Sequence, residues 1–132
     1  AAIEDYVVYG DEEYELPDFP LEKPADFQIF ESDCKLYASL LEQLRSMFYE
    51  CETSDPNTFI TENMNRLLTQ KAASVYSWNG NQGNIPVMKF VTMKILMECA
   101  RTLCGTTTKD SSVIIKKWFT QAKEASRFKD SK

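Results

Sequence analysis

The sequence predicts an all-α fold, a compact domain of four to five helices led by an extended acidic arm. Apolar residues recur at spacings of three and four over several long segments, which is the helical period. Residues 87–103 are apolar on nearly every side, which is typical of a buried central helix. Residues 1–26, in contrast, carry three prolines that interrupt any continuous helix. We therefore divide the chain into an acidic arm, 1–26, and an all-α globular domain, 27–132.

Charge is distributed unevenly along the chain. The formal net charge is −5, yet residues 1–33 hold eleven acids against the single base Lys23. The remainder carries more bases than acids, so an acidic arm leads into a mildly basic body. We interpret the arm as a solvated tail or as a strap over the body. A docking motif for a partner is the other alternative, and exchange of the arm between two chains stays open.

The first expected helix runs from residue 32 or 33 to Cys51. Ser32 or Asp33 can cap its first N–H groups. Its apolar side chains form one helical face, which we expect in the core: Leu36, Tyr37, Leu40, Leu41, Leu44, Met47, Phe48 and Cys51.

A second helix is expected after the turn at residues 53–56, with Pro56 at its first helical position. It ends near Thr69, and a short helical piece over 70–76 leads into the tight turn at Asn79-Gly80. Residues 87–90 can be briefly extended before the central helix. Gly105 ends that helix in the left-handed conformation, which glycine adopts at low cost.

The final expected helix follows a polar loop and has Asp110 or Ser111 as its N-cap. Its buried face is expected to comprise Val113, Ile114, Trp118, Ala122 and Ala125, with Ile115 and Phe119 beside them. Its outer side presents Lys116, Lys117, Thr120, Lys123 and Arg127.

No constellation of residues predicts an enzyme. The chain has no histidine, which excludes a nucleophile–histidine pair and a mixed Cys/His zinc site. The glycine turn at 80–83 matches no phosphate-binding loop. The four cysteines form no Cys-x-x-Cys pair and are expected to be reduced. We expect no cofactor, no metal and no small-molecule substrate. The central helix is too short and too charged to span a bilayer, so no membrane is expected.

Nucleic-acid binding is the alternative that the last helix offers. Lys116, Lys117, Lys123 and Arg127 can form the cationic face that phosphate contact requires. Arginine is the usual base reader, and this helix has only Arg127. A solvated basic surface explains the same pattern, so DNA remains a possible partner here.

The segment from Ser77 through the central helix resembles a helical domain of unknown function that is expanded in insects and occurs beside zinc-finger and transposon-derived DNA-binding modules. The resemblance covers about residues 16–105. Its matching residues are Leu16-Pro17, Phe19-Pro20-Leu21, Leu40-Leu41, Leu67-Leu68, Tyr76, Trp78, Gly80, Gly83, Phe90 and the helix over 95–100. The helical order is also similar to that of BEN domains, all-α modules of chromatin proteins that bind DNA or proteins. Either resemblance implies a nuclear adaptor without a catalytic site.

The sequence as a whole favours a non-enzymatic protein–protein interaction module of a chromatin- or transcription-associated protein. The expected partner is another protein or a second copy of the chain, as in a homodimer. Aromatic groups that a core does not need can form the interface: Phe19, Tyr76, Trp78 and Phe128. The alternative is a BEN-like DNA-binding domain. The chain opens on acidic residues without the pattern of a signal peptide, so nuclear or cytoplasmic localisation is expected.

Overall fold

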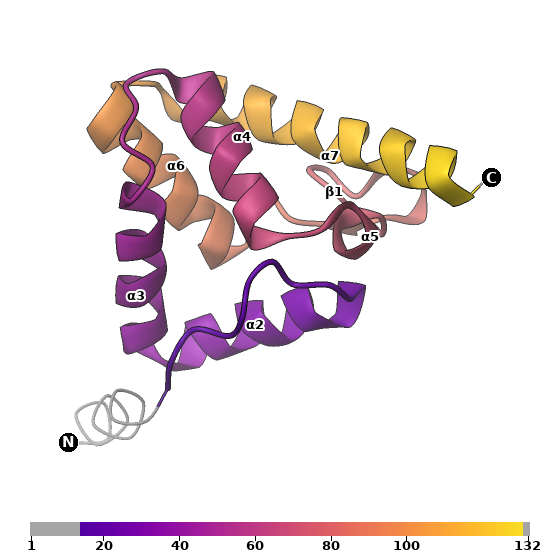
Figure 1. The fold of residues 1–132 in the computed structure, drawn as a ribbon, viewed down its shortest axis with the longest axis horizontal. Helices are drawn as coiled ribbons and strands as arrows, with labels where there is room; N and C mark the ends of the chain where they lie inside the picture. The colour runs from indigo at the N-terminus through magenta and orange to yellow at the C-terminus, as the bar shows by residue number, and fades with distance from the viewer. Residues whose placement is uncertain (1–13, 131–132) are drawn as a thin grey trace.

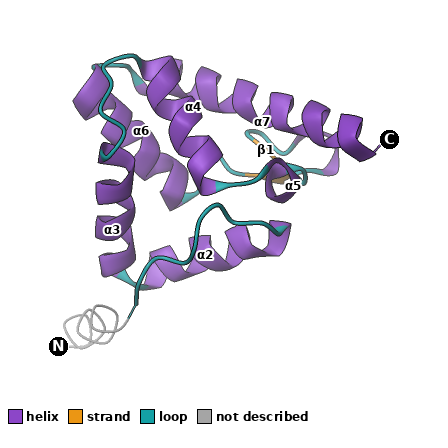
Figure 2. Ribbon diagram, viewed as in Figure 1, coloured by secondary structure: helices purple, strands orange, loops and turns teal. Residues whose placement is uncertain are grey.

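A computed structural model of the chain describes the backbone of residues 14–130 and the side chains up to Ser126. Two short parallel strands, β1 (Tyr76–Ser77) and β2 (Ile85–Pro86), flank a 3-10 turn at Asn81–Gly83 (Figure 2). The remaining elements are helices, which confirms the all-α fold class: α2 (Pro24–Leu36), α3 (Ala38–Tyr49), α4 (Pro56–Leu67), α5 (Gln70–Ala73), α6 (Val91–Cys104) and α7 (Thr108–Asp130).

Helix α6 is the centre of the fold, as its apolar sequence predicts. It packs against α2, α3, α4 and α7 (Figure 1). Met93, Leu96, Cys99 and Ala100 are fully buried along it. Gly105 ends the helix at φ 70°, a left-handed conformation that the sequence predicted. Between residues 14 and 130, no helix combines the length and apolar character needed to cross a membrane.

The N-terminus of α6 is stabilised by a side chain from another helix. Phe90 at its N-cap offers no side-chain acceptor, and no acid lies in the first turn. The Glu31 carboxylate of α2 accepts hydrogen bonds from the N–H of Val91 at 2.7 Å and of Thr92 at 3.1 Å. A negative charge there also interacts favourably with the helix dipole. Glu31, one of the eleven acids of residues 1–33, is buried in this contact, and its exposed fraction is 3%.

The single helix expected from residue 32 or 33 to Cys51 is two helices in the structure. Pro24, which we expected to lie in the arm, occupies the first turn of α2, where its missing N–H costs nothing. Tyr37 adopts an extended conformation (φ −125°, ψ 106°) and separates α2 from α3. The chain therefore turns a corner there (Figure 1). Apolar spacing did not reveal the break because one extended residue barely disturbs the pattern.

Residues 14–23 form a strap that lies over the helices, so this part of the arm packs in cis. The Leu21 N–H donates to the Leu67 carbonyl at 2.8 Å, and the Thr69 N–H donates to the Leu21 carbonyl at 3.0 Å. The Leu21 side chain is buried in the core. The folded unit therefore begins before the expected boundary at residue 27. Residues 1–13 lie outside the described part.

Helix α7 begins earlier than predicted. Its first residue is Thr108, and the Thr107 hydroxyl accepts from the Asp110 N–H at 3.1 Å. Threonine at 107, and not Asp110 or Ser111, therefore caps the helix. Val113 lies on the surface, where 60% of it is exposed, contrary to the expected core position. The expected burial of Trp118 and Ala122 is confirmed, and Ile115 and Phe119 are buried with them.

Candidate functional site

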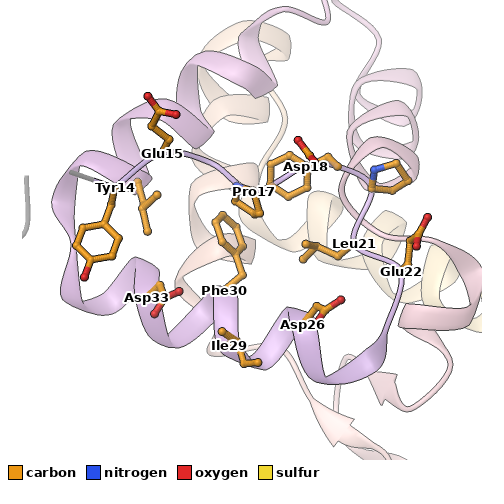
Figure 3. A pocket seen from close by; sticks show the side chains of 13 residues that line it. Tyr14, Glu15, Pro17, Asp18, Leu21, Glu22, Asp26, Ile29, Phe30 and Asp33 are labelled. Atoms are coloured by element: carbon orange, nitrogen blue, oxygen red, sulfur yellow. The ribbon is translucent and has the colours of Figure 1, made fainter. Parts of the chain in front are cut away.

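A groove lies between the strap and α2. We call it the acidic groove; its cavity volume is about 530 Å³. Figure 3 shows it from close by, with the strap along one side and α2 along the other. Its lining residues are Tyr14, Glu15, Pro17, Asp18, Phe19, Pro20, Leu21, Glu22, Asp26, Ile29, Phe30, Asp33 and Leu40.

The strap is held in place at both of its ends, which gives the groove a fixed wall. At the first end, the Gln43 amide of α3 donates to the Tyr14 carbonyl at 2.9 Å and accepts from the Leu16 N–H at 3.2 Å. The Tyr14 ring stacks on Tyr37, with ring centroids 3.7 Å apart. At the second end, the backbone of Leu21 is hydrogen-bonded to the backbones of both Leu67 and Thr69. The strap backbone between these anchors is therefore held at a fixed separation from α2, the opposite wall of the groove.

The interior of the groove is apolar. Phe30 is buried, and Phe19 packs on it edge to face, with ring centroids 5.5 Å apart. Ile29 of α2 also lines the groove, and 58% of its surface is exposed. An isoleucine this exposed next to an aromatic pair offers apolar surface that a second molecule can cover.

The rim of the groove is uniformly negative. It carries five carboxylates and, among the lining residues, no lysine or arginine: Glu15, Asp18, Glu22, Asp26 and Asp33. Several like charges beside a low-dielectric wall raise the local concentration of cations and of cationic segments. The acidic groove can therefore bind a segment that is both apolar and positively charged.

The expected interface aromatics do not gather on one surface. Phe19 lines the acidic groove and is half-buried, whereas Trp78 lies at a different pocket. Tyr76 is fully buried, and its hydroxyl donates to the Pro24 carbonyl. The expectation that Tyr76 is spare for an interface is wrong, because its ring packs edge to face on Phe27 in the core. The side chain of Phe128 lies outside the described residues.

The pocket that contains Trp78 also contains two of the expected cations. We call it the amide pocket; its volume is about 250 Å³, and it shares no lining residue with the acidic groove. Its lining residues are Ser77, Trp78, Asn79, Asn81, Gln82, Asn84, Lys116, Thr120, Lys123 and Glu124. A predicted protein interface residue and two predicted phosphate contacts thus share one site.

The cationic face expected on α7 is only partly assembled among the described residues. Lys116 and Lys117 are exposed. Lys123 is half-buried, and its ammonium donates to the Tyr76 carbonyl. Burial lowers the pKa of the Lys123 amine. The side chain of Arg127 lies outside the described part, so the fourth expected cation is not placed. Binding of duplex DNA to this face stays a prediction.

The cysteine side chains of the described residues are free thiols. Their surroundings raise their pKa values and so favour the protonated form. Burial, followed by the charges of Glu31 and Asp33, raises the pKa of Cys34 to about 12. Burial and a hydrogen bond to Glu62 at 3.0 Å raise that of Cys51 to about 11. Within residues 14–130, no three Cys, His, Asp or Glu side chains are placed together to hold a metal ion.

The acidic groove was missed at the sequence level, although one signal pointed to it. The sequence shows acids clustered in the first 33 residues, but four of the acids that line the groove are expected in a tail or strap, and Asp33 is expected at a helix N-cap. Five of them line one groove because the strap and α2 run side by side (Figure 3). The helical spacing of Asp26, Ile29 and Asp33 could have predicted a common face, had α2 been recognised.

Comparisons of the chain with family models, with curated proteins and with solved structures gave no match. The resemblances to the insect helical domain and to BEN domains therefore stay predictions.

Proposed function

We propose that this chain is a non-enzymatic protein–protein interaction module that holds a basic, apolar peptide segment of a partner in the acidic groove. The observation that carries the proposal is the pairing of a negative rim with apolar lining side chains, among which Ile29 is exposed. Such a groove attracts lysine and arginine side chains while an aliphatic or aromatic side chain covers Ile29 and Phe19. The nuclear, chromatin-associated setting belongs to the proposal and derives from the family resemblances.

The partner's segment is expected to place one bulky apolar residue between flanking cations. The apolar residue supplies burial, which contributes roughly 25 cal/mol for each Å² removed from water. The cations of the peptide mainly increase the rate of association with the groove and exclude acidic competitors. Their contribution to the binding affinity is smaller. Binding should therefore weaken as salt is raised, because the rim charges are exposed and screened.

The test is a fluorescence anisotropy titration of the whole chain with a labelled peptide that alternates leucine with arginine. A peptide with glutamate in place of arginine is the comparison. We expect saturable binding of the basic peptide only. Ile29→Ala and the double variant Asp18→Asn/Asp33→Asn should each weaken it by about threefold to tenfold.

The matched control is Glu52→Gln/Asp110→Asn, which removes two exposed carboxylates that do not line the groove. It should bind the peptide like the unaltered chain. Equal loss in both double variants would mean that overall charge, and not the groove, attracts the peptide, and the proposal would be wrong.

A second copy of the chain is the competing occupant, because α7 is basic. Light scattering after size exclusion should show a monomer. If the unaltered chain were a dimer and Ile29→Ala a monomer, the groove would be assigned to self-association. That result would overturn the proposal of a separate partner.

A further inference from the structure

The loop of the amide pocket presents three side-chain amides that the fold does not use. Asn79, Asn81 and Gln82 are exposed, and none of their amide groups bonds to another described residue. Only Asn84 is satisfied internally, by donating to the Asn81 carbonyl at 2.6 Å. Each free amide offers donors beside an acceptor, so the three can recognise a ligand edge that carries both.

The backbone of this loop is rigid and, at one residue, strained. The Gly80 N–H donates to the Ser77 hydroxyl at 2.8 Å, and the Asn84 N–H donates to the Asn81 carbonyl at 3.1 Å. Between these bonds Gln82 adopts φ 57°, ψ 37°; it is the one non-glycine with positive φ in the described part of the chain. Residues held in this region cost free energy and cluster at binding sites.

The opposite wall of the pocket adds positive charge, and Trp78 adds an aromatic side chain. Lys116 is exposed, while Lys123 is anchored through its bond to the Tyr76 carbonyl. Glu124 is the single acid among the lining residues, so the pocket has a net positive charge. Trp78 is half-buried against the core. Tryptophan is a common platform for flat rings.

We propose that the amide pocket binds a nucleoside phosphate. The base would lie against Trp78, where a free amide can donate to and accept from its edge, as Asn and Gln do with adenine. The phosphate would lie near Lys116, with Lys123 as the second cation. The cavity volume of about 250 Å³ lies below the range of about 300–1,000 Å³ that is ordinary for small-molecule sites, so the bound ligand is expected to be no larger than one nucleotide. This site is separate from the groove of the proposed function.

The same chemistry is present in a free nucleotide and in the end of a single nucleic-acid strand. Calorimetric titrations of the whole chain with adenosine monophosphate, with adenosine and with inorganic phosphate test the shared chemistry. We expect adenosine monophosphate to bind at least about tenfold more tightly than either half alone. Inorganic phosphate that binds as tightly as adenosine monophosphate would overturn the proposal.

A four-nucleotide single strand with a 5′ phosphate distinguishes the two sources. Clearly tighter binding than that of the mononucleotide identifies a strand end as the ligand. Equal affinity identifies a free nucleotide. Both results support a nucleoside phosphate site, and failure of both ligands overturns it.

Adjacent lysines supply the matched control. Lys116 lines the pocket and Lys117 does not, although both are exposed on α7. Lys116→Ala should weaken nucleotide binding by about threefold to tenfold, and Lys117→Ala by less than about twofold. Equal effects would place the nucleotide on the general surface of α7 and contradict the assignment.

The variant Gln82→Gly distinguishes an effect on nucleotide binding from an effect on the stability of the fold. Glycine adopts positive φ without strain, so the variant should unfold at a urea concentration no lower than that of the unaltered chain. Because it lacks the amide, it should bind the nucleotide more weakly. Unchanged nucleotide affinity in a folded Gln82→Gly chain would show that this amide has no role.

Discussion

Glu31 accepts two hydrogen bonds from Thr92, one from its backbone N–H and one from its hydroxyl, both at 3.1 Å. These residues lie 61 positions apart, so the contact fixes α2 onto the first turn of α6. The Glu31 side chain is 4% exposed, and Lys35 lies 3.8 Å from its carboxylate. A buried carboxylate on the free N–H groups of a helix combines hydrogen bonding with attraction to the helix dipole.

Replacement of Glu31 by glutamine is expected to destabilise the fold. The amide keeps the shape of the side chain but loses the charge, and one of its groups becomes a donor facing the donors of α6. The free energy of unfolding should fall by about 1–3 kcal/mol in urea denaturation. Glu22→Gln, on the exposed strap, should change it by less than about 0.5 kcal/mol. Equal effects of the two substitutions would contradict the capping role.

Leu21 is expected to make the strap part of the stability of the domain. Truncation to alanine removes buried atoms from the core and should lower the free energy of unfolding by about 2–5 kcal/mol. Leu36→Ala changes a leucine that is 46% exposed and should have a small effect. Urea denaturation measures both. A Leu21→Ala chain as stable as Leu36→Ala would show that the strap is not part of the cooperative unit.

Alkaline pH is expected to destabilise the chain through Cys34. Burial raises the pKa of its thiol from 9.0 to about 12 in the folded chain. Above about pH 9 the unfolded thiol releases its proton while the folded thiol keeps it. The contribution of this group to stability is therefore complete below pH 9 and declines as the pH rises toward 12.

The measurement for Cys34 is urea denaturation at several pH values between about 8 and 10. Stability should fall across this range in the unaltered chain. The decline should be shallower in Cys34→Ala, although that variant starts less stable because it leaves a cavity. Identical slopes would mean that Cys34 is not the group responsible.

Two glycines in the loop of the amide pocket should differ in their tolerance of alanine. Both have positive φ, 80° at Gly80 and 79° at Gly83, so alanine is strained at either by roughly 1 kcal/mol. A Cβ at Gly80 would also lie 3.1 Å from two atoms of Pro86, whereas one at Gly83 meets nothing within 4 Å. Thermal unfolding should show the larger loss for Gly80→Ala. The reverse order would contradict this account of the loop.

The elements that the sequence predicted well were those whose signals are local. The apolar run of α6 and the glycine that ends it identified the central helix. Pro56 and the turn before it marked the start of α4, where the Asp55 carboxylate accepts the Thr58 N–H at 2.9 Å. Caps and periodic faces depend on neighbours within a few residues, so they can be recognised without knowledge of the fold.

What could not be predicted depends on contacts between distant segments. Glu31 has the appearance of one more acid in an acidic arm until α6 is placed beside it. The acidic groove depends on the anchoring of the strap, in which Leu21 pairs with Leu67 and Thr69, and nothing in the strap sequence specifies these partners. Helix α7 also makes a distant contact that its own sequence does not reveal, since the Trp118 indole N–H donates to Asn65 of α4 at 2.8 Å. One-dimensional patterns carry no information on such pairs.

The pairing of Leu21 bears on the order in which the chain can fold as it is synthesised. The strap leaves the ribosome before α2 and the helices that follow it, yet its backbone partners are not complete until Thr69 has emerged. Closing so long a loop costs entropy that only the finished core repays. The strap is therefore expected to dock late, and until then a nascent chain presents Phe19, Leu21 and the apolar side of α2 to chaperones.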